Sequence, residues 1–236
     1  AALCVTGLLV AACGSDDDSA TSTTATETTA STETTGAPET TGATDTTTGD
    51  TTGDGGFPVE IENQFGTTVI ESQPERVVSI GYTDGDFILA LGVTPVAIRD
   101  WYGDQPGGLW PWAQETEAAA AGDIQVLSSE ELSVEAIAAL DPDVIIGLGS
   151  GMTEDQYNQL SQVAPTVAQS DEYVEWGTPW DVAQLTIGRA LGLEDEAQAL
   201  VDDVSGQISD AADAHPEWAG QTAQFGVVGP DGTWYS

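Results

Sequence analysis

Residues 76–98 read RVVSIGYTDGDFILALGVTPVAI, and this stretch decides the fold expected for the chain. It opens with an apolar, mostly β-branched run at 77–80, which is typical of a buried strand. Phe87, Ile88 and Leu91 follow at the spacing of residues that share the buried face of a helix. The stretch therefore begins with a predicted strand and continues into a predicted helix.

The end of this helix and the start of a second strand are also marked in the sequence. Gly92 suits the left-handed conformation that commonly follows a helix, and Pro95 lies just beyond it. Apolar residues resume at 96–98 and predict the second strand. A strand–helix–strand unit favours a right-handed crossover between two parallel strands. We therefore predict an α/β fold.

The turn after the first predicted strand is a candidate binding site. Open α/β sheets bind ligands at the carboxyl edge of their strands, and Tyr82, Thr83 and Asp84 stand at that edge. Asp84 and Asp86 together resemble a cation-binding pair. Acidic residues in the first turn of a helix also stabilise its positive end, and this explains both carboxylates without a cation.

The globular part, from Phe57 onward, continues to alternate strand and helix patterns. We expect a hairpin within 57–69, strands at 124–127, 144–147, 165–168 and 224–228, and helices at 109–121, 133–140, 153–163, 180–191 and 194–214. The last helix has about 20 residues and would span roughly 30 Å, the width of a small domain. Asp231-Gly232 then signals a second hairpin.

Aromatic residues gather in two of the expected loops. Trp101 and Tyr102 follow the second strand, and Trp176 and Trp180 flank turn residues. Loops at the carboxyl edge are positioned to meet ligand, so these four join Tyr82, Thr83 and Asp84 as candidate ligand-binding residues.

Ordinary packing under a loop is the favoured interpretation for Trp110, Trp112 and Trp180, although Trp180 stays among the ligand candidates. Arg99 has charge suited to an anionic ligand. With so many carboxylates in the chain, a structural ion pair is its favoured use.

The charge of the chain excludes one class of function. Its 236 residues include 40 Asp and Glu, three arginines, one histidine and no lysine, for a formal net charge of -37. Nucleic-acid binding needs a basic face to neutralise phosphates, and this composition cannot build one. We therefore expect no nucleic-acid partner.

The first 56 residues have a different composition from the rest. Residues 1–13, AALCVTGLLVAAC, are apolar and small, as in the remnant of a signal peptide. The end of this segment resembles the lipobox of bacterial lipoproteins, which implies that Cys13 is lipidated and begins the mature chain. A buried cysteine after a core helix is the alternative. Residues 14–56 are rich in Thr, Ser, Gly and acid and predict a disordered linker.

Several motifs in order resemble one protein family. They are PERVVSIGYTDGDFILALGVTPVAI, RDWYG with GLWPWA, LSVEAIAALDPDVIIG, WGTPW and IGRALGLEDEAQALV. Their order and spacing resemble the substrate-binding lipoproteins of bacterial ABC importers that carry ferric siderophores, haem or cobalamin. The WYG and LWPW elements look like the iron–siderophore binders.

The resemblance implies a particular architecture. It implies two Rossmann-like lobes joined by one long helix, with only the first lobe and the connecting helix largely present. On this interpretation residues 57–191 form the N-terminal α/β lobe and 192–215 the connecting helix. Residues 222–236 would then start a truncated C-terminal lobe.

The resemblance also implies a function. A lipid-anchored protein on the outer face of the cytoplasmic membrane would capture a ferric siderophore in the cleft between its lobes and deliver it to the permease. A monomer without enzymatic activity or an intrinsic cofactor is expected. The family motif places a permease-contacting glutamate at Glu135, although the helix dipole alone also explains a carboxylate there.

Two other functions remain open, and direct metal binding is disfavoured. The single histidine and the lack of a ligand cluster argue against a metal site built from side chains, so iron would arrive already chelated. A cell-surface hydrolase is one alternative, but Ser150 only partly matches a nucleophile motif and His215 is the sole histidine base. A surface sensor or adhesion module that shares the fold is the other.

Overall fold

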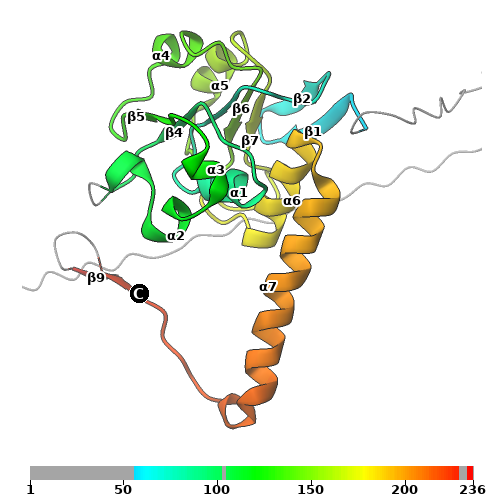
Figure 1. Ribbon diagram of the computed structural model, residues 1–236, viewed down its shortest axis with the longest axis vertical. Coiled ribbons are helices and arrows are strands. Elements are labelled where there is room, and N and C mark those ends of the chain that lie inside the picture. Colours follow the sequence, from blue (N-terminus) through cyan, green and yellow to red (C-terminus); the bar gives the residue numbers. More distant parts are fainter. Residues whose placement is uncertain (1–55, 103–104, 229–232, 236) are drawn as a thin grey trace, which may run out of the picture. The chain divides into compact units, whose positions relative to one another are not determined.

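The computed structural model describes residues 56–102, 105–228 and 233–235. The expected signal peptide remnant, its lipobox at Cys13 and almost all of the expected linker lie outside the described residues, as does Asp231-Gly232. The described part contains a five-stranded parallel sheet with the order β5-β4-β3-β6-β7, which Figure 1 shows with helices packed around it. The strands are β3 (Val77–Ser79), β4 (Ala97–Arg99), β5 (Gln125–Leu127), β6 (Val144–Gly147) and β7 (Thr166–Ala168). The predicted α/β fold is confirmed.

The central strands β3 and β6 are buried at every residue because both faces of the sheet are covered. Val77, Val144 and Ile146 pack in one cluster with Ile88 and Ile187, which lie on helices α1 and α6. The alternate residues of the same strands pack in a second cluster on helices α4 and α5. The bounds of these helices are Asp84–Ala90 for α1, Val134–Ala138 for α4, Glu154–Leu160 for α5 and Trp180–Leu191 for α6.

The expected hairpin is present and is attached to the edge of the sheet. Its strands β1 (Val59–Asn63) and β2 (Gly66–Ile70) pair in antiparallel register. The Thr68 hydroxyl donates to the carbonyl of Thr166 in β7 at 2.6 Å. The backbone N–H of Gln64 donates to the carbonyl of Gln169 at 2.9 Å. These bonds tie the hairpin to the strand that leads into one wall of the cleft described below.

The single helix expected at 109–121 is wrong. The structure has a 3-10 turn η1 (Pro106–Gly108) and two short helices, α2 (Pro111–Gln114) and α3 (Glu117–Ala120). Thr116 is extended, with φ -72 and ψ 146, and its hydroxyl accepts from the N–H of Ala119 as the N-cap of α3. The same hydroxyl donates to the carbonyl of Ala113 at 2.8 Å. A threonine that caps a new helix therefore interrupts the expected one.

The long helix α7 (Glu194–Ala214) has the bounds expected from the sequence. Gly192 ends α6 in the left-handed conformation, with φ 69. Gly188 allows α7 to approach α6, since a Cβ at that position would lie 2.3 Å from the Cβ of Ala197. Only Ala197 and Val201 of α7 are buried, so most of the helix extends away from the lobe, as Figure 1 shows.

The residues after α7 form a short turn and a hairpin. The 3-10 turn η2 (Pro216–Trp218) follows, and β8 (Val227–Val228) pairs antiparallel with β9 (Trp234–Tyr235). The strand expected at 224–228 is thus shorter in the structure. No helix in the described ranges is both long enough and apolar enough to span a membrane.

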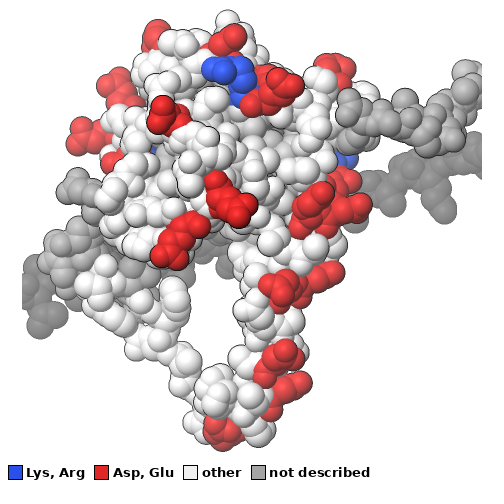
Figure 2. All heavy atoms as spheres, in the orientation of Figure 1, with Lys and Arg blue, Asp and Glu red and all other residues white. Residues whose placement is uncertain are grey.

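Acidic side chains dominate the charged groups of the described surface. Figure 2 shows them spread over the lobe and along α7, with basic atoms in small patches only. The ion pairs among the described residues are Arg189–Glu194 at 3.6 Å and His215–Glu217 at 2.9 Å, and all four side chains are exposed. Such a surface repels itself and is screened by salt.

Candidate functional site

Two loops at the carboxyl edge of the sheet are bonded to each other by backbone and side-chain groups. The N–H of Tyr82, after β3, donates to the carbonyl of Gly149, after β6, at 3.0 Å. In return, the carboxylate of Asp84 accepts from the N–H of Gly149, at 3.1 and 3.2 Å for its two oxygens. Gly81 leaves room for this carboxylate, since a Cβ there would lie 2.0 Å from Asp84 Oδ2. Asp84 therefore fixes the two loops that form the floor of the site.

The carboxylates of α1 are held in unusual surroundings. Asp84 is only 2% exposed, and burial raises its pKa from 3.8 to about 6, although hydrogen bonds from the backbone of Gly149 and Leu148 oppose the shift. Burial also raises the pKa of Asp86, against the effect of a hydrogen bond from Trp112. Their place in the first turn of α1 fits the helix-dipole explanation given from the sequence. The hydrogen bond from the N–H of Gly149 to its carboxylate gives Asp84 a second structural role.

Gln169, at the end of β7, organises one wall of the site. It is 6% exposed, and its Oε1 accepts from the N–H of Trp176 at 3.1 Å. Its Nε2 donates to the carbonyls of Tyr173 and Val174, at 3.0 and 2.7 Å. Trp176 has a φ of 65, a left-handed conformation that is uncommon for a bulky residue. Gln169 thus bonds both a donor and two acceptors of the backbone in a strained loop, and it fixes the position of the Trp176 ring.

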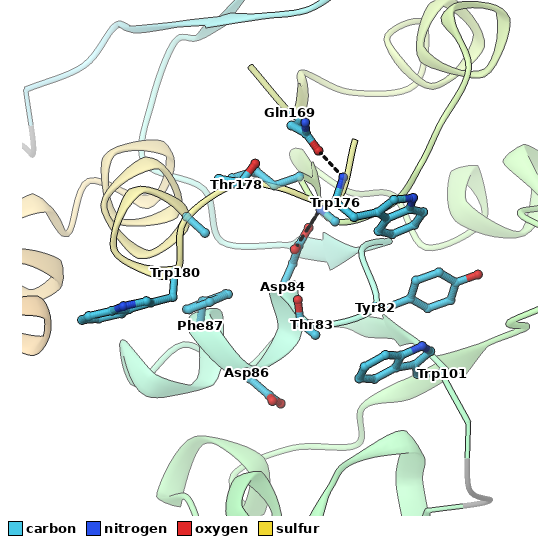
Figure 3. Close-up of a pocket in the computed structure, with 13 residues that line it drawn as sticks. Tyr82, Thr83, Asp84, Asp86, Phe87, Trp101, Gln169, Trp176, Thr178 and Trp180 are labelled. Atoms are coloured by element: carbon cyan, nitrogen blue, oxygen red, sulfur yellow. Dashed lines mark hydrogen bonds between the residues drawn. The ribbon is translucent and has the colours of Figure 1, made fainter. Parts of the chain in front are cut away.

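Three aromatic rings from three different loops form a stack across the site. Figure 3 shows Tyr82 with Trp176 on one side and Trp101 on the other. The Tyr82 ring centre lies 5.6 Å from that of Trp176, at 24° between planes, and 6.1 Å from that of Trp101, at 26°. Trp101 is 40% exposed and Trp176 is 54% exposed. The stack therefore leaves flat aromatic surface free for a ligand.

Arg99 supports this stack from within the protein. Its guanidinium carbon lies 4.3 Å from the centre of the Tyr82 ring. Its two terminal nitrogens donate to the carbonyls of Ser129, at 3.0 Å, and Ser150, at 3.2 Å. Within the described residues Arg99 pairs with no carboxylate, in place of the structural ion pair that the sequence favoured. The ring and the two carbonyls provide its contacts instead.

These elements enclose a cleft of about 760 Å³ in the range typical of small-molecule sites. Six of the seven ligand candidates line it: Tyr82, Thr83, Asp84, Trp101, Trp176 and Trp180. Tyr102 does not line it; its ring meets Trp101 edge-on at 4.6 Å and Trp110 at 5.2 Å. Among the lining residues that sequence reasoning missed are Gln169 and Thr178. The sequence feature that could have identified Gln169 as a site residue is its place as a polar residue directly after a buried strand.

Trp110 and Trp112 extend the aromatic surface, and Trp180 adds to the lining of the cleft. Trp110 and Trp112 stack at 5.2 Å with 10° between their planes, and Trp112 is 64% exposed. Nε1 of Trp112 donates to Oδ2 of Asp86 at 2.9 Å. Trp112 is therefore not packed under a loop, as the sequence favoured, but lies on the surface and is bonded to a carboxylate of the cleft. Trp180 is exposed and lines the cleft.

The polar groups near the cleft do not form a catalytic arrangement with Ser150. The Ser150 hydroxyl donates to the carbonyl of Gly147 at 2.7 Å and accepts from the N–H of Met152 at 3.2 Å. His215 lies at the end of α7 and bonds with Glu217 instead. Among the residues that the structure places, no three His, Cys, Asp or Glu side chains gather to hold a metal ion. Glu135, the expected permease contact, is exposed in the first turn of α4 behind its N-cap, Ser133.

Comparisons with known proteins agree on the fold and the class. The family model described as periplasmic binding protein matches residues 77–236. The "Probable siderophore-binding lipoprotein YfiY" of Bacillus subtilis is 31% identical over 153 residues, which cover 64% of this chain and 43% of YfiY.

Two solved structures extend the comparison. A periplasmic solute binding protein from Mycobacterium smegmatis is 38% identical with a TM-score of 0.64, over 68% of this chain and 55% of that one. PiaA of Streptococcus pneumoniae, crystallised in complex with ferrichrome, is 31% identical with a TM-score of 0.61, over 67% and 53%. The chain thus spans about half the length of these relatives. From the match over residues 77–236, the chain belongs to the periplasmic binding protein family.

Proposed function

We propose that the chain belongs to the substrate-binding component of an ABC importer and captures a ferric siderophore in the described cleft. The observation that carries the proposal is the stack of Tyr82, Trp101 and Trp176 at the carboxyl edge of the parallel sheet, in which both tryptophans are exposed. Flat rings and a few polar groups suit a bulky, partly planar ligand. The similarity to YfiY, a probable siderophore-binding lipoprotein, and to PiaA, crystallised with ferrichrome, supports the same ligand class.

The proposed domain organisation follows from this function. Residues 57–191 would form the N-terminal lobe, 192–215 the connecting helix, and 222–236 the start of a second lobe that completes the cleft. The exposed length of α7 supports its role as a connector. Iron would enter already chelated, so the protein would need no cofactor of its own, and one copy would suffice for binding.

Binding is tested by titrating the full-length protein with ferric siderophores, haem and cobalamin while tryptophan fluorescence is followed. Saturable quenching by a ferric siderophore is the expected result, because Trp101 and Trp176 line the cleft. Trp176→Ala should weaken binding. Trp218→Ala is the matched control, because Trp218 is equally exposed but stacks on His215 after α7. A protein that responds to none of these ligands would instead fit a sensor or adhesion module.

We also propose that Cys13 carries a lipid and that residues 14–56 tether the lobe to the outer face of the cytoplasmic membrane. The lipobox-like residues before Cys13 support this location. Radiolabelled palmitate should be incorporated into the wild-type protein in cells, and Cys13→Ser should abolish both labelling and membrane retention. A Cys13→Ser protein that stays with the membrane fraction would exclude the anchor.

Delivery to the permease is proposed to use Glu135. This carboxylate is exposed and is held at the helix start, where the Ser133 hydroxyl donates to it at 3.3 Å. Glu135→Lys should leave siderophore affinity unchanged and abolish uptake by cells. Glu117→Lys is the matched control, because Glu117 is likewise exposed in the first turn of a short, capped helix. Normal uptake by the Glu135→Lys protein would remove this role.

A further inference from the structure

Among the described residues, the charged side chains that line the cleft are carboxylates only. Two carboxylates, Asp84 and Asp86, lie among the thirteen lining residues, which include no arginine, lysine or histidine. The other polar side chains of the lining are uncharged. One of them, Thr178, has a buried hydroxyl without a hydrogen-bond partner among the described residues. The described wall therefore offers neutral hydrogen-bonding groups and two carboxylates, but no positively charged side chain.

The few basic residues of the chain are engaged elsewhere. The chain has three arginines and no lysine. Arg76, at the amino end of β3, donates to the carbonyls of Leu140 and Asp141, on the opposite edge of the sheet from the cleft. Arg189 pairs with Glu194. Arg99 stacks on Tyr82, is bonded to two carbonyls, and is not among the residues that line this cleft.

The aromatic stack also favours positive over negative charge in a ligand. The face of an aromatic ring is electron-rich and attracts cations, most strongly for tryptophan. Trp101 and Trp176 are both exposed and line the same cleft as Asp86. At the described wall, an anionic ligand would meet two ring faces and two carboxylates and no side chain of positive charge, which is costly in a partly buried site.

We propose, resting on the function proposed above, that this cleft selects ferric complexes with neutral or positive charge and rejects anionic ones. The chemical class that fits is the hydroxamate siderophores, because hydroxamate groups balance the charge of Fe(III). A tris-catecholate complex of Fe(III) retains a net negative charge and belongs to the rejected class.

A set of ligands that share one iron chelate tests the role of charge alone. Ferrioxamine B carries a free ammonium group, its N-acetyl derivative is neutral, and its N-succinyl derivative is anionic. Ferric enterobactin serves as the tris-catecholate. Each is titrated into the full-length protein by tryptophan fluorescence at low and physiological ionic strength. We expect ferrioxamine B to bind at least roughly fivefold tighter than the succinyl derivative, with the difference shrinking as salt is added.

The Asp86→Asn variant locates the effect in the cleft. Asparagine keeps an oxygen that accepts from Trp112 and removes the charge. Its affinity for ferrioxamine B should fall about threefold to tenfold while that for the acetyl derivative stays within about twofold. Glu75→Gln is the control, because it removes one exposed charge at the amino edge of the sheet. It should change neither affinity.

The possible outcomes separate this inference from the function on which it rests. Equal or tighter binding of the anionic derivative, or of ferric enterobactin alone, would overturn the charge preference and leave the carrier function standing. If Asp86→Asn and Glu75→Gln lower the affinity for ferrioxamine B equally, the selection does not come from the cleft. If no ferric complex binds, the proposed function fails and this inference fails with it.

Discussion

Gln169 holds Trp176 in a left-handed backbone conformation through a hydrogen bond of 3.1 Å from the N–H of Trp176 to Oε1 of Gln169. The same amide donates from Nε2 to two carbonyls of the loop before Trp176. One buried side chain thus satisfies three backbone groups, and none of the three lies in a helix or strand. The position of the outermost ring of the aromatic stack therefore depends on a single amide.

Gln169→Leu should destabilise the lobe and loosen the aromatic wall. Leucine preserves the volume but leaves the N–H of Trp176 and the carbonyl of Tyr173 without their partner, which costs about 1–3 kcal/mol in the free energy of unfolding. The carbonyl of Val174 still accepts from the N–H of Gly177 at 2.8 Å. Urea denaturation gives the stability, and near-ultraviolet circular dichroism reports the order of the tryptophan rings. Gln162→Leu is the control, because the exposed amide of Gln162 donates to a single backbone carbonyl, that of Asn158 in α5. Equal losses for the two variants would show that Gln169 has no special role.

Replacement by glycine or by alanine should affect stability in opposite order at Trp176 and at Trp101, the two outer rings of the stack. Because its φ is 65, Trp176→Gly should be more stable than Trp176→Ala by about 1 kcal/mol, although both lack the ring. At Trp101, which is not among the described residues with positive φ, Ala should be the more stable replacement. Urea denaturation of the four variants measures both differences. If Ala is favoured at both sites, the Trp176 backbone is not strained.

The central part of the fold was predictable because its signals are local. The pattern in residues 76–98 contains a buried strand, a helix face and a helix end, and the structure has β3, α1 and β4 in that order. Helix α7 had the expected bounds because Gly192 and Pro216 mark its two ends. The break at Thr116 was missed because a hydroxyl that caps a new helix overrides apolar spacing.

Part of the site was predictable because its residues sit directly after strands. Tyr82 and Trp101 follow β3 and β4 at the carboxyl edge, and parallel pairing brings these edges together. The role of Gln169 depends on how the loop to Trp176 folds back, which no local pattern encodes. The partners of Arg99 are likewise carbonyls of two distant loops, so composition alone favoured an ion pair.

Arg99 should be important for stability without an ion pair. Arg99→Ala leaves the carbonyl of Ser150 without its donor, leaves that of Ser129 with only the Tyr82 hydroxyl at 3.4 Å, and removes the contact of the guanidinium with the Tyr82 ring, so we expect a loss of about 1–3 kcal/mol. Arg99→Lys should recover part of it, because an ammonium group cannot span both carbonyls and the ring as a planar fork does. Arg189→Ala is the control and should cost less than about 1 kcal/mol, because its pair with Glu194 is exposed. A smaller loss at Arg99 than at Arg189 would contradict this account.

Asp84 should give the wild-type protein a distinct dependence on pH. Burial raises its pKa from 3.8 to about 6, so between these values the folded state binds more protons than the unfolded state. The contribution of Asp84 to the free energy of unfolding therefore increases as pH falls from 6 towards 3.8, by about 3 kcal/mol at most.

The Asp84→Asn variant isolates this contribution, because it lacks the titrating group but keeps an oxygen that accepts from the N–H of Gly149. Asp86, the other carboxylate of the cleft, is present in both proteins, and so is the remaining negative charge of the surface. The stability of the wild type relative to the variant should rise from pH 7 to pH 4 in urea denaturation series. The rise should be the same at low and high salt, because salt screens the exposed carboxylates but not a group inside the lobe. A difference that stays flat across this range would mean that Asp84 is not buried as an ionisable group.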